Sequence, residues 1–189
     1  MGSGQAGLGS SYAILGHKKI IPIVTAADDD FSMPLAVMLL SSITGFSGKA
    51  RNSAEYSLQI YVLDLEISKE NKQKLKMVCE STEPKKDVTV SFVPIEITRL
   101  MPHRFARDKN SYLIPSISHL GPAVLARLYI PELFYRQYDK IIYLDGDLLI
   151  QGDIVELWEI DIGDYQLAAC REENTYYIDG IADAKICDR

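Results

Sequence analysis

Two aspartates separated by a glycine, Asp145 and Asp147, are the residues of this chain best suited to hold a metal ion. In an extended segment, residues two apart point to the same side, so both carboxylates face one space. Gly146 permits a tight backbone and close approach of a ligand. Two such carboxylates repel each other unless a cation lies between them, and Mg²⁺ or Mn²⁺ prefers oxygen ligands and also binds phosphate. The pair therefore predicts a divalent-metal site that could neutralise a diphosphate leaving group.

The same pair also allows a second interpretation, because two aspartates two residues apart form a weak motif that often occurs by chance. That alternative is a solvated acidic turn after a strand. The run KIIYL, residues 140–144, stands directly before the pair and is apolar on both faces. Such a run predicts a buried, central strand. A fixed position at the end of a strand favours the functional interpretation.

A second acidic cluster, AADDDF over residues 26–31, follows the apolar run that begins at Lys18 and ends at Thr25. This run predicts a buried strand that leads into an acidic loop. In open parallel sheets, ligands bind beyond the carboxyl ends of the strands. Because both acidic clusters follow a predicted strand, we expect them on the same edge of the sheet, at a shared site.

Strand and helix signals alternate along the rest of the chain. A helix is predicted to start at Ser32, as its cap, with Pro34 in the first turn, and to end near Gly45. Further strands are predicted over 58–64 and 88–92, and further helices over 68–79, from about 121 to 134, and over 153–158. This alternation predicts an α/β domain with a mostly parallel central sheet and flanking helices.

The composition is that of an ordinary globular protein, since 189 residues suit one domain and 47% of them are hydrophobic. The formal net charge of -6, from 20 basic and 26 acidic side chains, argues against general nucleic-acid binding, which usually needs a basic surface. No apolar run approaches the roughly 20 residues that span a bilayer. Residues 1–16 are expected to be a flexible leader or tag, which leaves 17–189 for the folded domain.

The three cysteines, Cys79, Cys170 and Cys187, are widely spaced and form no CxxC pair. They suggest neither a disulfide framework nor a zinc site, so a reducing, cytosolic setting is the simplest interpretation. The oligomeric state cannot be predicted from this sequence.

Four segments together resemble glycosyltransferase family 8, the group that includes bacterial lipooligosaccharide galactosyltransferases and glycogenin. They are PIVTAADDDF from Pro22, YVLDLEISKENKQKL from Tyr61, SISHLGPAVLARLYIPELF from Ser116 and KIIYLDGDLLIQGDIVELWEIDIGD from Lys140. The resemblance implies a GT-A fold, a UDP-sugar donor and Mn²⁺ or Mg²⁺ as cofactor. It also implies retaining transfer of a hexose to a saccharide or glycolipid acceptor, with lipopolysaccharide biosynthesis as one setting and a peripheral membrane position open for a full-length protein.

In the first loop, the resemblance assigns donor contacts to Ala26, Ala27, Asp28, Asp30 and Phe31. Asp28 and Asp30 could accept hydrogen bonds from the uracil N–H and the ribose hydroxyls, and Phe31 could stack on the base. Phe31 keeps the ring of the tyrosine that family members often have here, without its hydroxyl group. The alternative is that the acids cap the following helix, and the residues alone weigh the two interpretations about evenly.

Later in the chain, the resemblance assigns donor contacts to His119, Arg127 and the Asp145-Gly146-Asp147 segment, and metal binding to the two aspartates. Arg127 lies among apolar helix residues, where an arginine is costly to bury without an anionic partner. Its alternative is a surface arginine whose stem packs on apolar neighbours. No catalytic nucleophile is identified.

Members of the family normally continue past the end of this chain, through a donor-sugar segment and a histidine that completes the metal site. The chain is therefore expected to be C-terminally truncated, with two protein ligands for the metal plus phosphate and water. Two other functions stay open. One is a non-catalytic nucleotide-sugar-binding fragment or interaction module. The other is a haloacid-dehalogenase-like phosphatase with Asp145 as nucleophile and Asp147 as general acid, although that motif normally lies near the N-terminus.

Overall fold

The computed structural model describes residues 14–15, 18–49, 55–82, 87–96 and 122–169. The chain divides into two units, Met1–Glu159 and Ile160–Arg189, and every described helix and strand lies in the first. In the second unit, residues 160–169 contain no helix or strand and have a turn at residues 163–164. There the Gly163 N–H donates to the Asp161 carboxylate at 2.8 Å, and Gly163 has a left-handed φ of 54°, which glycine adopts at little cost.

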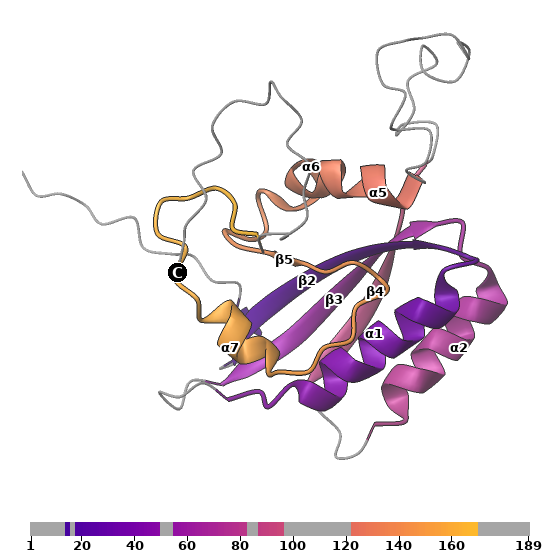
Figure 1. Ribbon diagram of the computed structural model, residues 1–189, viewed down its shortest axis with the longest axis horizontal. Coiled ribbons are helices and arrows are strands. Elements are labelled where there is room, and N and C mark those ends of the chain that lie inside the picture. Colours follow the sequence, from indigo (N-terminus) through magenta and orange to yellow (C-terminus); the bar gives the residue numbers. More distant parts are fainter. Residues whose placement is uncertain (1–13, 16–17, 50–54, 83–86, 97–121, 170–189) are drawn as a thin grey trace, which may run out of the picture. The chain divides into compact units, whose positions relative to one another are not determined.

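Five strands form one sheet. They are β1 (Ile14–Leu15), β2 (Lys18–Asp28), β3 (Tyr56–Leu65), β4 (Val88–Pro94) and β5 (Ile142–Tyr143). The last four are parallel and take the order β4-β3-β2-β5, while β1 is antiparallel to β2 (Figure 1). Along the chain, β3 and β4 are added on one side of β2, and β5 is then added on its other side. The strand order therefore reverses between β2 and β5. Doubly wound sheets bind ligands in the crevice at such a reversal, beyond the carboxyl ends of the strands.

Helices cover both faces of this sheet, which confirms the predicted α/β fold (Figure 1). They are α1 (Ser32–Gly45), α2 (Lys69–Glu80), α5 (Pro122–Ala126), the 3₁₀ helix η2 (Arg127–Tyr129), α6 (Ile130–Phe134) and α7 (Ile154–Trp158). The helices α1, α2 and α7 pack on one face, against Ile21 and Ile23 of β2. The helices α5 and α6 pack on the other, against the alternate residues Val24 and Ala26. This period of two is expected of a strand buried on both faces.

The start of α1 differs from the prediction. Ser32 is the first helical residue and Phe31 is the N-cap, so the assignment of Ser32 as the cap is wrong. The Ser32 hydroxyl donates to the Asp29 carbonyl at 2.7 Å. The Asp28 carboxylate accepts the Phe31 N–H at 3.0 Å, so the last residue of β2 orders the turn that enters the helix.

The starts of α2 and α7 agree with their sequence signals. The Ser68 hydroxyl accepts the Asn71 N–H at 3.2 Å and caps α2. The Asp153 carboxylate accepts the Val155 N–H at 3.0 Å and caps α7. Asp153 also accepts the Ser47 N–H at 3.2 Å, which ties the start of α7 to the segment after α1.

Three strand predictions need adjustment. β2 runs on through Asp28, because β3 pairs with it from Lys19 to Asp28, so residues 26–28 belong to a strand rather than a loop. β5 has two half-buried residues and, within the described sheet, pairs only with β2, so the predicted central position is not seen. The predicted leader, residues 1–16, includes β1, which pairs with Lys18 and Lys19.

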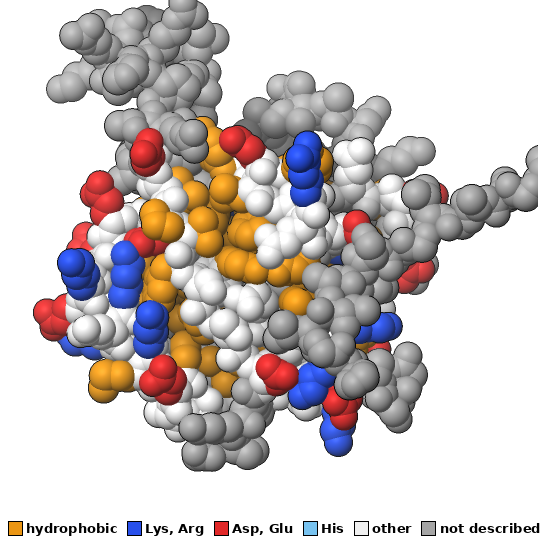
Figure 2. Space-filling model, turned by 180° about the vertical axis from the view of Figure 1, so that it is seen from behind, with side chains coloured by type: hydrophobic (Ala, Val, Ile, Leu, Met, Phe, Trp, Pro, Cys, Tyr) orange, Lys and Arg blue, Asp and Glu red, His pale blue; other side chains and the backbone are white. Residues whose placement is uncertain are grey.

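The exposed surface carries large hydrophobic side chains such as Met33 on α1, which is 79% exposed. Figure 2 shows hydrophobic side chains gathered toward the middle of one face, with basic and acidic side chains interspersed around them. Among the described residues, no helix has the length and apolar content needed to cross a bilayer.

Candidate functional site

The acidic segment after β5 lies beside the carboxyl end of β2. The Leu144 N–H donates to the Val24 carbonyl at 3.0 Å, which carries the pairing past β5. Gly146 is buried, and a Cβ at this position would stand 3.6 Å from the Ala26 carbonyl oxygen and 3.5 Å from Cδ1 of Phe31. The two predicted acidic segments, 26–31 and 145–147, therefore meet beyond the carboxyl ends of the paired strands β2 and β5.

Gly146 packs closely against the first acidic segment. Among the described glycines, only Gly48 and Gly163 have a positive φ, so Gly146 does not use the left-handed conformation that glycine permits. Its closeness to Phe31 and Ala26 instead leaves room for no more than a small side chain.

Asp145 is the centre of a polar cluster. Its Oδ1 atom accepts hydrogen bonds from Nη2 of Arg127 at 3.1 Å and from the Tyr143 hydroxyl at 3.0 Å. The Arg127 guanidinium lies over the Tyr143 ring, 4.9 Å from its centroid. Burial, followed by the charge of Asp145, raises the pKa of Tyr143, so the phenol is protonated at neutral pH and donates. Because the Arg127 and Asp145 side chains are 38% and 50% exposed, solvent screens their attraction and the ion pair adds little stability.

Arg127 reaches Asp145 from a break in a helix. The sequence predicts one helix from about 121 to 134, but η2 separates α5 from α6. Pro131 explains the break, because its ring has no N–H and clashes with the carbonyl of residue 127 in a regular α-helix. The Ile130 N–H bonds to the Arg127 carbonyl instead, which tightens the turn. The anionic partner expected for Arg127 is thus the carboxylate of Asp145.

The residues of the first segment differ in what they can offer a ligand. Ala26 and Ala27 are buried in β2, so only their backbone groups are available. One oxygen of Asp28 accepts the Phe31 N–H before the helix begins, and no side chain caps α1, so the capping alternative is not what the structure shows. Asp30 is exposed, and the Phe31 ring is 38% exposed.

Asp29, which the sequence did not single out, links the first segment to α2. Its Oδ1 atom accepts the Ser68 N–H at 2.7 Å and Nδ2 of Asn71 at 2.9 Å. These hydrogen bonds hold the pKa of Asp29 below its ordinary value. Asp29 therefore fixes the position of the loop between β2 and α1, which also carries Asp30.

Tyr143 is the other site residue that sequence reasoning missed. Its signal was available, because a residue two positions before Asp145 on an extended strand points to the same side as Asp145. The approach of Arg127 had no such signal, since that contact depends on how η2 packs over the sheet.

The carboxylate oxygens of Asp145 and Asp147 are the kind of ligand that a hard divalent cation prefers. Asp147 is exposed and lies in a turn in which the Leu148 N–H donates to the Asp145 carbonyl at 3.3 Å. The extended backbone predicted for the pair is therefore wrong beyond Asp145, because the chain turns directly after it. Within the described ranges, no group of three or more His, Cys, Asp or Glu side chains is arranged to hold a metal. Two carboxylates suffice when water and substrate phosphates complete the coordination of the ion. The predicted donor contact His119 lies outside the described residues.

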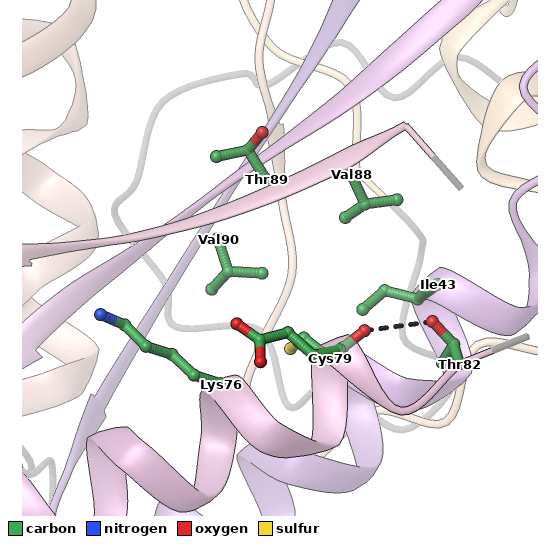
Figure 3. Close-up of a pocket in the computed structure, with 8 residues that line it drawn as sticks. Ile43, Lys76, Cys79, Thr82, Val88, Thr89 and Val90 are labelled. Carbon is green, nitrogen blue, oxygen red and sulfur yellow. Dashed lines mark hydrogen bonds between the residues drawn. The ribbon is translucent and has the colours of Figure 1, made fainter. Parts of the chain in front are cut away.

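A cavity of about 590 Å³ lies elsewhere, between α2 and β4 (Figure 3). It is lined by Ile43, Lys76, Cys79, Glu80, Thr82, Val88, Thr89 and Val90, and by none of the predicted site residues. Burial raises the pKa of the Cys79 thiol to about 11, so the thiol is protonated at neutral pH and is a poor nucleophile.

Known proteins match this chain over most of its length. A family model described as glycosyl transferase family 8 matches residues 22–187. General stress protein A of Bacillus subtilis (strain 168) is 30% identical over 156 residues, which make up 82% of this chain and 47% of that protein. The chain therefore spans about half the length of this relative.

Solved structures share the architecture. An apo structure of the bifunctional glycosyltransferase WbbM aligns with a TM-score of 0.55 at 23% identity, over 82% of this chain and 23% of that one, a likeness that shows the fold alone. An active-site mutant of LgtC aligns with a TM-score of 0.54 at 27% identity, over 80% of this chain and 46% of that one. The galactosyltransferase LgtC in complex with donor and acceptor sugar analogues aligns with a TM-score of 0.50 at 26% identity, over 76% of this chain and 44% of that one. The LgtC matches confirm the predicted GT-A fold.

Proposed function

This chain belongs to glycosyl transferase family 8, and we propose that it binds a UDP-sugar with Mn²⁺ or Mg²⁺ as the donor-binding part of a hexosyltransferase. The observation that carries the proposal is the meeting of segments 26–31 and 145–147 beyond the carboxyl ends of β2 and β5, where the strand order reverses. Nucleotides bind at this place in doubly wound sheets. Because the chain spans about half the length of its relative, transfer itself is proposed for the whole protein.

The nucleotide half of the donor is proposed to lie along the first segment. The exposed face of Phe31 is available to stack on the uracil ring. Asp30 is exposed and Asp28 is partly exposed, so their carboxylates can accept hydrogen bonds from the base and the ribose hydroxyls. The buried residues Ala26 and Ala27 contribute only backbone groups.

The diphosphate half is proposed to lie over Asp145 and Asp147. These two carboxylates would hold the divalent ion, whose chemistry is to neutralise charge on the diphosphate as the sugar bond breaks. Arg127 adds a fixed positive charge beside them and already contacts Asp145 at 3.1 Å. Its planar guanidinium suits a phosphate or the hydroxyls of the sugar, and we assign it to the donor as well. His119 is proposed as a further donor contact.

The acceptor and the stereochemistry are proposed by family membership. One of the similar solved structures is the galactosyltransferase LgtC with donor and acceptor sugar analogues bound. We extend this to a saccharide or glycolipid acceptor and to retention of anomeric configuration in a protein that contains this chain. A cytoplasmic setting, with lipopolysaccharide synthesis as one candidate role, completes the proposal.

The test measures release of UDP from a panel of UDP-hexoses by a protein that contains this chain, with and without saccharide acceptors. Release is expected with Mn²⁺ and is expected to be lost in Asp147→Asn, which removes one charge with little change of shape. Asp164→Asn makes the same change on an exposed residue of the second unit and is expected to behave as the unaltered protein. Equal release by all three proteins, or release that ignores the metal, would contradict the proposal.

Binding of the donor without transfer is the second candidate function. It is favoured because only two carboxylates, Asp145 and Asp147, are proposed as metal ligands, and the described ranges hold no group of three metal-binding side chains. Metal-dependent UDP binding together with no release of UDP from any UDP-hexose would select this candidate. The phosphatase alternative is set aside, because the family match covers residues 22–187.

A further inference from the structure

We propose that Tyr143 is a positioning residue for the metal site. Its side chain holds the Asp145 carboxylate and the Arg127 guanidinium in one fixed arrangement. The inference rests on the proposed function of Asp145 and Asp147 as metal ligands. It adds a residue that contacts neither the ion nor the donor but decides how the first carboxylate is presented to them.

The hydrogen bonds at Asp145 are unevenly shared between its two oxygens. Oδ1 accepts both the Tyr143 hydroxyl at 3.0 Å and Nη2 of Arg127 at 3.1 Å. Within the described part of the chain, no hydrogen bond to Oδ2 is made. Tyr143 and Arg127 together therefore fix the plane of the carboxylate and leave Oδ2 for an approaching cation.

The ring of Tyr143 serves the second charged group. It lies beneath the Arg127 guanidinium at 4.9 Å, so one side chain contacts the cation through its face and the anion through its hydroxyl. Without the hydroxyl, Asp145 could turn to meet Arg127 with both oxygens, in the two-point geometry that the guanidinium favours. That geometry would compete with metal binding.

Tyr143 is itself firmly held. It lies on β5 opposite Val24 of β2 and packs against the cluster formed by β2, β3, α5 and α6. Support of this kind, which orients a metal ligand through a hydrogen bond, commonly changes metal affinity about tenfold to a hundredfold when it is removed.

A simpler alternative is that the Tyr143 hydroxyl only stabilises the fold. The same cluster offers a matched control, because Tyr61 and Tyr138 also pack there and their hydroxyl groups lie 2.6 Å apart. Tyr138→Phe removes a hydrogen-bonded phenol hydroxyl from this cluster without altering a residue of the proposed site. Tyr143→Phe removes one that contacts Asp145.

The experiment measures Mn²⁺ affinity in the presence of UDP, from the enhancement of water-proton relaxation, for the full chain and the two variants. Tyr143→Phe is expected to weaken Mn²⁺ binding about tenfold, while Tyr138→Phe stays within about twofold of the unaltered chain. Equal affinity in the unaltered chain and Tyr143→Phe would overturn the proposal, as would an equal loss in both variants.

A second measurement separates this inference from the proposed function. Nitrogen-15 NMR of the metal-free chain reports rotation of the Arg127 guanidinium, which is expected to be slow in the unaltered chain and in Tyr138→Phe and fast in Tyr143→Phe. If the unaltered chain binds no Mn²⁺, the proposed function fails, and this signal still decides whether Tyr143 holds Arg127. Unchanged rotation in Tyr143→Phe would overturn the inference by itself.

Discussion

Gly146 lies against the ring of Phe31, so closely that a methyl group on the glycine would stand 3.5 Å from Cδ1 of the ring. The contact joins two segments that are more than a hundred residues apart in sequence. It exists because β5 pairs with β2 and the chain then follows the edge of β2 to Ala26. The segment that carries the acidic pair and the proposed base-binding ring are thus in contact.

Gly146→Ala is expected to be tolerated, because the contacts of the added methyl group are ordinary and the backbone is not left-handed. The free energy of unfolding should stay within about 1 kcal/mol of the unaltered chain. Gly45→Ala is the contrast, since its Cβ would stand 2.8 Å from the Gly152 carbonyl oxygen and should cost about 1–3 kcal/mol. Urea unfolding measures both, and an equal loss in the two variants would contradict the packing described at Gly146.

Asp29→Ala is expected to lower the thermal unfolding temperature at neutral pH, because the carboxylate bonds to Ser68 and Asn71 are lost. Those bonds lower the pKa of Asp29 below its ordinary 3.8. A depressed pKa gives stability that is present above the unfolded value and is lost as the pH falls through the folded value. The difference in unfolding temperature between the two proteins should therefore shrink as the pH falls below about 4.

The control for this change is Asp30→Ala, which removes the same charge one residue later. Within the described part of the chain, no hydrogen bond to the Asp30 carboxylate is made, so its unfolding temperature should follow that of the unaltered chain at every pH. If the difference in unfolding temperature between Asp29→Ala and the unaltered chain does not change with pH, the Asp29 carboxylate does not tie the loop to α2.

Leu75→Ala is expected to destabilise the chain by about 2–5 kcal/mol, because it removes a fully buried side chain and leaves a cavity. Leu75 is 2% exposed and is the buried contact of α2 with the sheet, whereas Met77 on the same helix is 66% exposed. Met77→Ala should change the unfolding free energy by less than about 0.5 kcal/mol. Similar losses in the two variants, measured by urea unfolding, would mean that α2 does not pack as described.

Elements that rest on local signals could be predicted from the sequence. The Ser68 cap places the start of α2, and the Asp153 cap places the start of α7. The alternation of Val88, Val90 and Phe92 with polar residues predicts the half-buried β4. In each case the residues near the boundary determine the outcome, so distant contacts change little.

Features that depend on distant contacts could not be predicted in the same way. Asp29 is one acid among three until α2 docks and presents the Ser68 N–H to it. The sequence around β5 predicts a longer, central strand, yet its described pairing with β2 covers two residues. The break at Arg127 has a local signal in the sequence, because Pro131 interrupts a regular helix. The apolar residues around Pro131 favour one continuous helix and hide that signal.

The central claim is that Asp145 and Asp147 bind nucleotide through a divalent ion, and calorimetric titration of UDP into the chain with Mn²⁺ tests it most directly. The unaltered chain should release or take up heat with Mn²⁺ and show none after chelation. The double variant Asp145→Asn, Asp147→Asn should show none with the metal present, while the double variant Asp161→Asn, Asp164→Asn, matched in charge, should bind normally. No binding by the folded unaltered chain, or equal UDP affinity in the two double variants, would contradict the account.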